Sequence, residues 1–278
     1  MKKILFISSL AVALVVSSCK KADFADSYTD PSKIAVSSVE KQFSGFVNSN
    51  LGYIMPGYWN YFVVQRITNN RYTQSVGWSN ATGQYIPGGG AVSDHWNSYY
   101  NFLSQYKELV KINKALSPAD QAERRIFMIA ATIYFYDYTQ KMVDVHGDLP
   151  WSGAGMLSAN GGDYLASLPK YDKAQDIYTK MLDDLKAFST ELNSLTIPAA
   201  IQTAFNTQDF ILKGNKTHWT RYCNSLRLRM LTRVSGSTEL GARATSEIAA
   251  MATAPATFPM VSSNAENVQI NVFSLNTP

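Results

Sequence analysis

Residues 172–188, DKAQDIYTKMLDDLKAF, decide the fold class of this chain. Asp172 followed by Gln175 three residues later predicts the start of a helix, because this spacing is typical of an N-terminal cap. After the cap, apolar residues recur at every third or fourth position, which places them on one stripe of an α-helix. The stripe consists of Ala174, Ile177, Tyr178, Met181, Leu182, Leu185 and Phe188. A helix with one apolar face must pack against other elements, so the segment predicts a helical protein.

Helical patterns dominate the rest of the chain as well. Ser117, Pro118 and Asp120 have the side chains preferred at a cap and in a first turn, and the helix that they begin is expected to run to about Val143. That helix is apolar nearly all round, which indicates burial on several sides. Further helices are expected at about 36–46, 95–116, 216–234 and 239–251.

The order of these helices predicts a mainly α fold. Two antiparallel helix pairs, separated by a long insertion, resemble tetratricopeptide-like stacking, in which each pair buries its face on the next. The usual sequence signature of that repeat is absent, so this expectation rests on helix pairing alone. The predicted fold class is therefore tetratricopeptide-like stacked helix pairs with long irregular loops.

The first 18 residues predict a lipoprotein signal peptide. Two lysines precede an apolar run at 4–16, and this run is shorter than the ~20 residues that a membrane span needs. Two serines then precede Cys19, so we expect lipid attachment at Cys19 after cleavage. Two or more acyl chains would anchor the protein stably without crossing the bilayer. The alternative is an ordinary secretory signal followed by an incidental cysteine.

Residues 19–35 are expected to form a solvated tether, and residues 36–278 one helical domain. The chain has 278 residues with 46% hydrophobic and 17% charged side chains, which is a globular composition. Its 25 basic and 21 acidic residues leave little net charge, and the basic ones are scattered. This distribution argues against nucleic-acid binding.

Cysteine and histidine usage predicts neither a disulfide nor a metal site. If Cys19 carries lipid, Cys223 stands alone and is expected to be a small buried apolar residue. His95, His146 and His218 lie far apart in the sequence and lack the spacing of zinc ligands. No cofactor and no metal were therefore expected.

Several motifs occur together in this sequence, and they are Ser17-Ser18-Cys19, Asp30-Pro31, Asp144-Val145-His146-Gly147-Asp148-Leu149-Pro150-Trp151, Asp209-Phe210 and the segment 219–229. Together they resemble the SusD/RagB family of outer-membrane nutrient-binding lipoproteins from Bacteroidota. The segment 219–229 is similar to the family's Trp-x-x-Phe-Ala-Asn-Ser-Leu-Arg-Leu-Arg helix, with Tyr222 and Cys223 in place of Phe-Ala, a change that we expect to pack. The resemblance covers essentially the whole chain.

This resemblance implies a lipid-anchored protein of the cell outer membrane, facing the exterior. It implies capture of oligosaccharides or peptides, delivery to a SusC-like TonB-dependent transporter, and no enzymatic activity. Members of the family are usually near twice this length, so we expect the chain to be the N-terminal part of such a protein, ending in a strand-like segment at 268–273. The alternative is a non-catalytic helical scaffold lipoprotein of the cell envelope, and a lipoprotein glycosidase is a more distant one.

Candidate ligand-binding residues lie in an irregular excursion at 53–94, rich in glycine and proline. Trp78, Asn80 and Tyr85, with Tyr72 nearby, combine flat apolar rings for sugar C–H faces with an amide for hydroxyls. Three of the five tryptophans precede residue 100, and exposed aromatics there would form a binding surface. The alternative is that these rings pin the excursion onto the helices.

Other motifs carry weaker functional interpretations. The glycines at 88–90 lack the Lys-Ser/Thr pair and the preceding strand of a phosphate loop. Asp144 and Asp148 could be imagined as a glycosidase pair, but turn and cap roles near Gly147 explain them better. The basic row on the helix at 216–234 is expected to be solvated or paired with a neighbouring helix, and it consists of Arg221, Arg229 and Arg233.

Overall fold

The computed structural model describes residues 37–55 and 89–269, together with 57–59, 61, 62, 66, 70, 73 and 75 between them. The predicted signal peptide, Cys19 and the tether at 19–35 lie outside these residues. The described elements are α3 (Val39–Ser49), α4 (Leu51–Ile54), α6 (Gly89–Lys114), α7 (Pro118–Glu123), α8 (Arg125–His146), β1 (Leu149–Pro150), η2 (Leu165–Ser167), β2 (Tyr171–Asp172), α9 (Ala174–Ser194), α10 (Ala199–Gln208), α11 (Lys216–Val234), α12 (Gly241–Thr253) and η3 (Asn264–Glu266).

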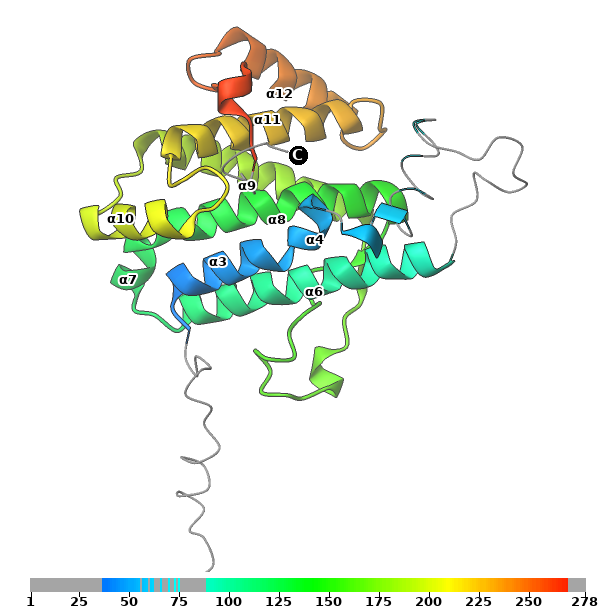
Figure 1. The fold of residues 1–278 in the computed structure, drawn as a ribbon. Helices are drawn as coiled ribbons and strands as arrows, with labels where there is room; N and C mark the ends of the chain where they lie inside the picture. Colours follow the sequence, from blue (N-terminus) through cyan, green and yellow to red (C-terminus); the bar gives the residue numbers. More distant parts are fainter. Residues whose placement is uncertain are drawn as a thin grey trace, which may run out of the picture. The chain divides into compact units, whose positions relative to one another are not determined.

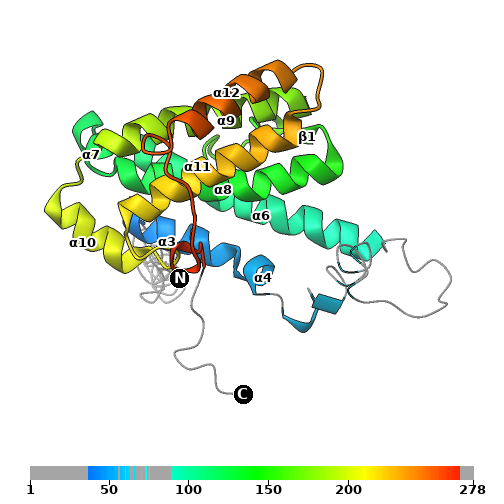
Figure 2. The ribbon, with the colours of Figure 1, turned by 90° about the horizontal axis from the view of Figure 1, so that it is seen from above.

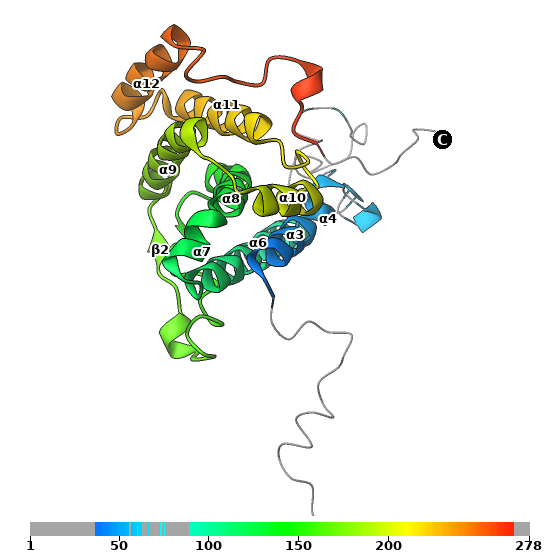
Figure 3. The same ribbon diagram turned by 90° about the vertical axis from the view of Figure 1, so that its left-hand side faces the viewer.

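The long helices form a stack in which each packs mainly on its neighbours. Helix α3 packs on α6, α6 on α8, α8 on α9, α9 on α11, and α11 on α12 (Figures 1 and 3). Helix α10 packs beside α3, and α11 also contacts α8 (Figure 2). In the described part of the chain the only sheet joins β1 and β2 as a short antiparallel pair. The predicted mainly α fold of stacked helix pairs is confirmed.

Aromatic rings fill the space between α3, α6 and α8, which we call the aromatic half. Phe46 stacks on Phe102 with ring centroids 4.5 Å apart, and Tyr106 stacks on Phe135 at 4.2 Å. Such ring pairs contribute about 0.5–1.5 kcal/mol each beyond the burial of their area. Nearly every side chain of α8 from Ile126 to Val143 is buried, which confirms the expectation that this helix is covered on several sides.

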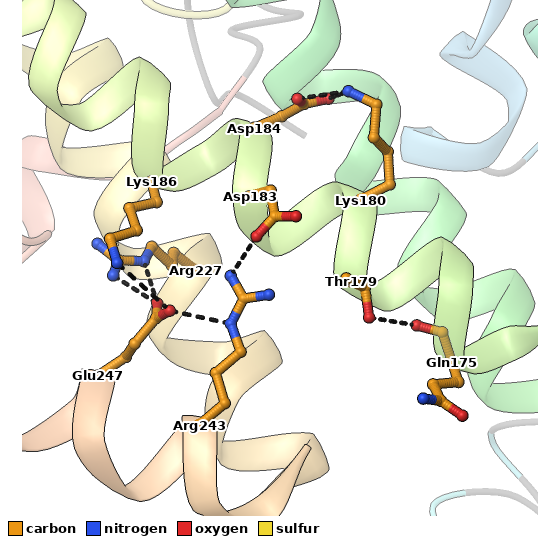
Figure 4. A network of polar contacts seen from close by, with 9 residues as sticks. All are labelled: Gln175, Thr179, Lys180, Asp183, Asp184, Lys186, Arg227, Arg243 and Glu247. Carbon is orange, nitrogen blue, oxygen red and sulfur yellow. Dashed lines mark hydrogen bonds and ion pairs between the residues drawn. The ribbon is translucent and has the colours of Figure 1, made fainter. Parts of the chain in front are cut away.

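Helices α9, α11 and α12, with the turn after α10, form what we call the polar half. Arg227 of α11 is buried, and its Nε and Nη2 donate to Glu247 of α12 at 3.2 and 2.5 Å (Figure 4). Arg243 binds the same carboxylate at 2.9 Å and reaches Asp183 of α9 at 2.8 Å. Two carboxylates, Glu247 and Asp183, therefore join three helices through directional contacts.

The turn between α10 and α11 is built on a buried carboxylate, Asp209. Its oxygens accept hydrogen bonds from the backbone N–H groups of Ile211, Leu212 and Gly214 and from the indole N–H of Trp219, at 2.7–3.1 Å. Gly214 has a φ of +72°, a conformation that suits glycine. The Asp-Phe and Trp motifs noted in the sequence are thus parts of one turn.

Two helix boundaries differ from the sequence prediction because of contacts with distant residues. The helix expected from Ser117 to about Val143 is interrupted at Arg124, whose guanidinium donates to Glu40 of α3 at 2.8 Å. The cap expected at Asp172 is wrong. Asp172 instead accepts hydrogen bonds from the Trp151 and Ser152 backbone N–H groups, and α9 begins at 174.

The other predicted boundaries agree to within about three residues except the start of α6, which lies at Gly89 rather than at about 95, and α11 has the predicted bounds. Helix α6 begins earlier than expected, α3 and α12 begin slightly later, and α10 was not predicted. Cys223 is buried as expected. Only residues 268 and 269 of the strand-like segment are described. Among the residues that the structure describes, no helix combines the length and apolarity needed to cross a membrane.

Candidate ligand-binding site

The structure describes the two ends of the excursion that was predicted to bind ligand, but not its centre. The four candidate residues lie outside the described residues, and they are Tyr72, Trp78, Asn80 and Tyr85. One end follows α4, and the other end is the start of α6. The indole N–H of Trp59 donates to the Asp94 carboxylate, so the two ends meet. The predicted binding segment is therefore anchored where α6 begins and α8 ends, at the right of Figure 1.

Exposed aromatic rings gather at this anchor, and we call them the aromatic rim: Tyr58, Trp59, Tyr61 and Phe62. The side chains of Tyr58 and Trp59 are 78% and 60% exposed. The rings of Tyr58 and Phe62 lie 4.6 Å apart, and the Arg66 guanidinium lies over Phe62 at 5.3 Å. Exposed rings beside a guanidinium and a carboxylate offer flat apolar faces together with polar groups at their edge.

The only indication of the aromatic rim in the sequence was the concentration of tryptophans before residue 100. The letters at 58–62 show no helical stripe, so nothing in them separates exposed rings from buried ones. The contact between Trp59 and Asp94 spans 35 residues and has no local signature. A concentration of aromatic residues outside any amphipathic pattern was the one usable signal.

A second cluster lies at the same end of the stack, where α4, α6 and α8 meet. The ring of Tyr53 stacks on Tyr138 at 4.2 Å, and the Lys141 ammonium lies 5.0 Å from the Tyr53 ring centre. His95, the residue after Asp94, lies beside His146 with a separation of 3.4 Å between ring nitrogens. Burial, with smaller contributions from the charges of His146 and Lys141, lowers the pKa of His95 to about 4. Burial also lowers the pKa of His146.

The carboxylates weighed as a glycosidase pair hold the fold together instead. Asp144 accepts from the Tyr178 hydroxyl at 2.5 Å and pairs with Arg233 at 3.1 Å. Asp148 caps α9 by accepting from the Ala174 N–H at 2.9 Å, which confirms its cap role.

The basic row of α11 is paired with neighbouring segments, as one of its interpretations expected. Arg229 binds Asp137 of α8 at 2.7 Å, and Arg233 binds Asp144 of the same helix. Arg221 pairs with Glu266 at 3.1 Å. These three guanidinium groups therefore join α11 to α8 and to the segment after α12.

A second exposed apolar surface lies on the loop between β1 and β2, which projects from the helices (Figure 1). The loop has internal hydrogen bonds: Asn160 donates to the Ala166 carbonyl at 3.1 Å, and the Ala166 N–H donates to Asp163. Gly155 of this loop approaches α6 so closely that a Cβ would lie 2.6 Å from Leu103. We call the exposed residues the apolar loop surface, and they are Leu157, Tyr164, Leu165, Leu168 and Tyr171.

Solved structures resemble this chain in fold. A chitin-binding protein is 23% identical, with a TM-score of 0.58 over 83% of this chain and 45% of its own. A SusD homolog from Parabacteroides distasonis is 20% identical, with a TM-score of 0.62 over 83% of this chain and 41% of its own. A chitin-binding SusD homolog from Flavobacterium johnsoniae is 19% identical, with a TM-score of 0.55 over 82% of this chain and 45% of its own.

The chain thus spans less than half the length of these solved structures. No curated protein sequence matches it. A family model does match, over residues 40–277, and its description is SusD-like, starch-binding, associating with the outer membrane. Because that match covers most of the sequence, the chain belongs to the SusD-like family of outer-membrane nutrient-binding proteins.

Proposed function

We propose that this chain is part of a surface lipoprotein that binds oligosaccharides or peptides and passes them to a TonB-dependent transporter. Membership of a family of outer-membrane binding proteins supports the general role. The observation that carries the ligand-binding part is the aromatic rim. Its rings are 38–78% exposed at the anchor of a glycine-rich excursion, and such exposure is costly unless the rings serve a surface contact.

The aromatic rim suits a ligand with alternating apolar and polar edges. Sugar rings present C–H faces that stack on indole and phenol rings, and their hydroxyls pair with charged groups such as Arg66 and Asp94. Peptides with aromatic side chains offer a similar combination. Chitin is the ligand in the names of two proteins of the same fold, so chitooligosaccharides are the first ligands to test.

The binding proposal is tested by calorimetric titration of the full chain with chitooligosaccharides, maltooligosaccharides and short peptides. Trp59→Ala and Trp78→Ala are each expected to weaken binding by up to about tenfold, since a stacked aromatic contact contributes about 0.5–1.5 kcal/mol. Tyr164→Ala is the matched control, because Tyr164 is an equally exposed ring on the apolar loop surface. Equal losses in all three variants, or none in the tryptophan variants, would contradict the assignment.

The apolar loop surface supports the partner proposal. Tyr164, Leu165 and Leu168 are each more than half exposed on a loop held by its own hydrogen bonds. Several exposed apolar side chains on one loop with internal hydrogen bonds are typical of a surface that a partner covers. We propose that the outer-membrane transporter is that partner.

The partner proposal is tested by mild-detergent purification of the native gene product from its host, with intact mass measurement of the eluate. A co-eluting barrel protein and a Cys19-acylated chain are expected. Leu165→Asp is expected to remove the barrel, and Tyr58→Asp, on the aromatic rim, to retain it. An acylated chain without a barrel, and without ligand binding, would favour the envelope scaffold instead.

A further inference from the structure

His95 and His146 are 51 residues apart in the sequence but adjacent in the fold. His95 lies in the first third of α6, and His146 is the last residue of α8. The Nδ1 atom of His95 and the Nε2 atom of His146 are 3.4 Å apart, and the two ring planes differ by 27°. Two imidazole nitrogens therefore face each other at the end of the helical stack.

The two nitrogens lie within hydrogen-bond distance, but their separation of 3.4 Å also fits two ligands of one metal ion. Hydrogen bonds donated by N–H groups have typical donor–acceptor distances of about 2.9–3.0 Å. Two nitrogens bound tetrahedrally to Zn²⁺, at about 2.0–2.1 Å each, lie about 3.3–3.4 Å apart. A right-angled arrangement with the same bond lengths would need about 2.9 Å. The observed 3.4 Å matches the tetrahedral separation.

Neighbouring rings hold the two imidazoles in this arrangement. Trp96 contacts the His146 ring edge-on at 5.2 Å, and Tyr138 lies 5.9 Å from the His95 ring. Side chains fixed by packing lose little freedom when they bind an ion. His146 also ends a 22-residue helix, whose carboxyl end carries partial negative charge and favours a cation.

One nearby charge opposes a cation. The Lys141 ammonium interacts with His95, but it also pairs with the Asp137 carboxylate at 3.4 Å and lies over the Tyr53 ring. These contacts offset part of its charge. Because the Lys141 ammonium is nearby, we expect the two histidines to bind a cation with moderate affinity.

We propose that His95 and His146 form a binding site for one divalent ion that accepts tetrahedral imidazole coordination, Zn²⁺ being the representative. The described residues contain no cluster of three or more histidine, cysteine or acidic side chains that could hold a metal. The site therefore supplies two protein ligands and leaves two positions to water or to an oxygen of a bound molecule. Binding is weaker and more exchangeable than at a four-ligand structural zinc site.

The test is titration of the full chain with Zn²⁺ by calorimetry and with Co²⁺ by visible absorption, at pH 7. Cys19→Ser is carried in every sample so that its thiol does not compete. One Zn²⁺ per chain and the intense bands of tetrahedral Co²⁺ are expected. His95→Asn and His146→Asn are each expected to lower the affinity at least about tenfold, since even loss of outer partners costs 10–100-fold. His218→Asn, in the first turn of α11, is the matched control.

A wild-type chain that takes up no Zn²⁺ at one ion per chain, or a His95 or His146 variant that binds as tightly as wild type, would overturn the proposal. Imidazole NMR signals of the wild-type chain give a readout that does not depend on variants folding. Zn²⁺ is expected to shift the signals of His95 and His146 and to leave those of His218. A shift confined to His218 would also overturn the proposal.

Discussion

The aromatic half and the polar half of this molecule stabilise similar helix packing by different means. Between α3, α6 and α8 the contacts are ring against ring, as for Phe46 on Phe102. Between α9, α11 and α12 the buried contacts include charged groups, with Glu247 bound by Arg227 and Arg243. Ring packing does not depend on pH, whereas buried ion pairs depend on the protonation of their carboxylates.

The difference indicates where the molecule tolerates change. In a packed aromatic core, a substitution lowers the free energy of unfolding according to the volume of buried side chain that it removes. In a buried polar network, removal of one partner also leaves the others desolvated without a hydrogen bond. The following substitutions test this contrast, from the largest expected effect to the smallest.

Asp209→Ala is expected to have the largest effect, with a loss of about 5 kcal/mol or more in the free energy of unfolding. Four buried donors lose their acceptor at once, and each orphaned donor costs about 1–3 kcal/mol. Urea denaturation checks this value. Asp209→Asn keeps one carbonyl oxygen and is expected to lose clearly less; equal losses in both variants would remove the hydrogen-bond explanation.

Phe46→Ala is expected to lower the free energy of unfolding by about 3–5 kcal/mol, through lost burial and a cavity between α3, α6 and α8. The loss is expected to be the same at pH 7 and pH 4, as measured by urea denaturation. Val145→Ala, an exposed apolar position on α8, is the control and is expected to change stability by less than about 0.5 kcal/mol. A Phe46→Ala loss that changes with pH would break the contrast between the halves.

Glu247→Gln is expected to lower the free energy of unfolding by about 2–3 kcal/mol at neutral pH, because Arg227 loses its charged partner. Burial raises the pKa of Glu247, but hydrogen bonds and charges from Arg227 and Arg243 outweigh burial and hold it below its usual 4.5. The ionised carboxylate therefore stabilises the fold above pH 4.5, and this contribution is lost as the pH falls through the folded-state pKa.

The difference between wild type and Glu247→Gln is thus expected to shrink as the pH drops below 4.5. Chemical denaturation at pH 7, 5 and 3.5 measures it. A difference that stays constant over this range would show that Glu247 acts through packing rather than charge.

Arg125→Met is expected to have the smallest effect, about 0.5–1 kcal/mol. Arg125 of α8 binds Glu191 of α9 through two hydrogen bonds at 2.7 and 2.8 Å, but both side chains are about one-third exposed. Thermal unfolding at 0.05 and 0.5 M salt checks this, since salt should reduce the wild-type advantage. A cost comparable to that of Glu247→Gln would mean that burial does not separate the two ion pairs.

The sequence predicted helix boundaries well where the residues that set them are close together in the chain. Helix α11 has its predicted bounds because Asn215 caps it, accepting from the His218 N–H at 3.1 Å, and Trp219 begins its buried face. The break at Arg124 was missed because its partner Glu40 is 84 residues away. The cap of α9 was assigned to Asp172, although Asp148 supplies it across the small sheet.

The candidate site was predictable only as a region. An aromatic, glycine-rich excursion pointed to residues 53–94, but the ring exposure at Trp59 depends on its contact with Asp94, which no periodicity reveals. The three histidines were judged by their spacing in the sequence, and spacing does not reveal that His95 and His146 lie side by side in the fold. Their proximity arises from the antiparallel packing of α6 and α8, which brings the start of one helix to the end of the other.

Because each helix packs mainly on its neighbours, the helices of the stack are expected to unfold locally in a definite order. Helix α12 is the last helix of the stack and packs mainly on α11, and its buried side chains are only Ala244 and Met251. Because so little apolar area lies beneath it, the ion pairs of Glu247 with Arg227 and of Arg243 with Asp183 are important for holding α12 on the stack (Figure 4). Its amides would therefore exchange with solvent sooner than those of α8, and α12 could detach and redock while the aromatic half stays folded.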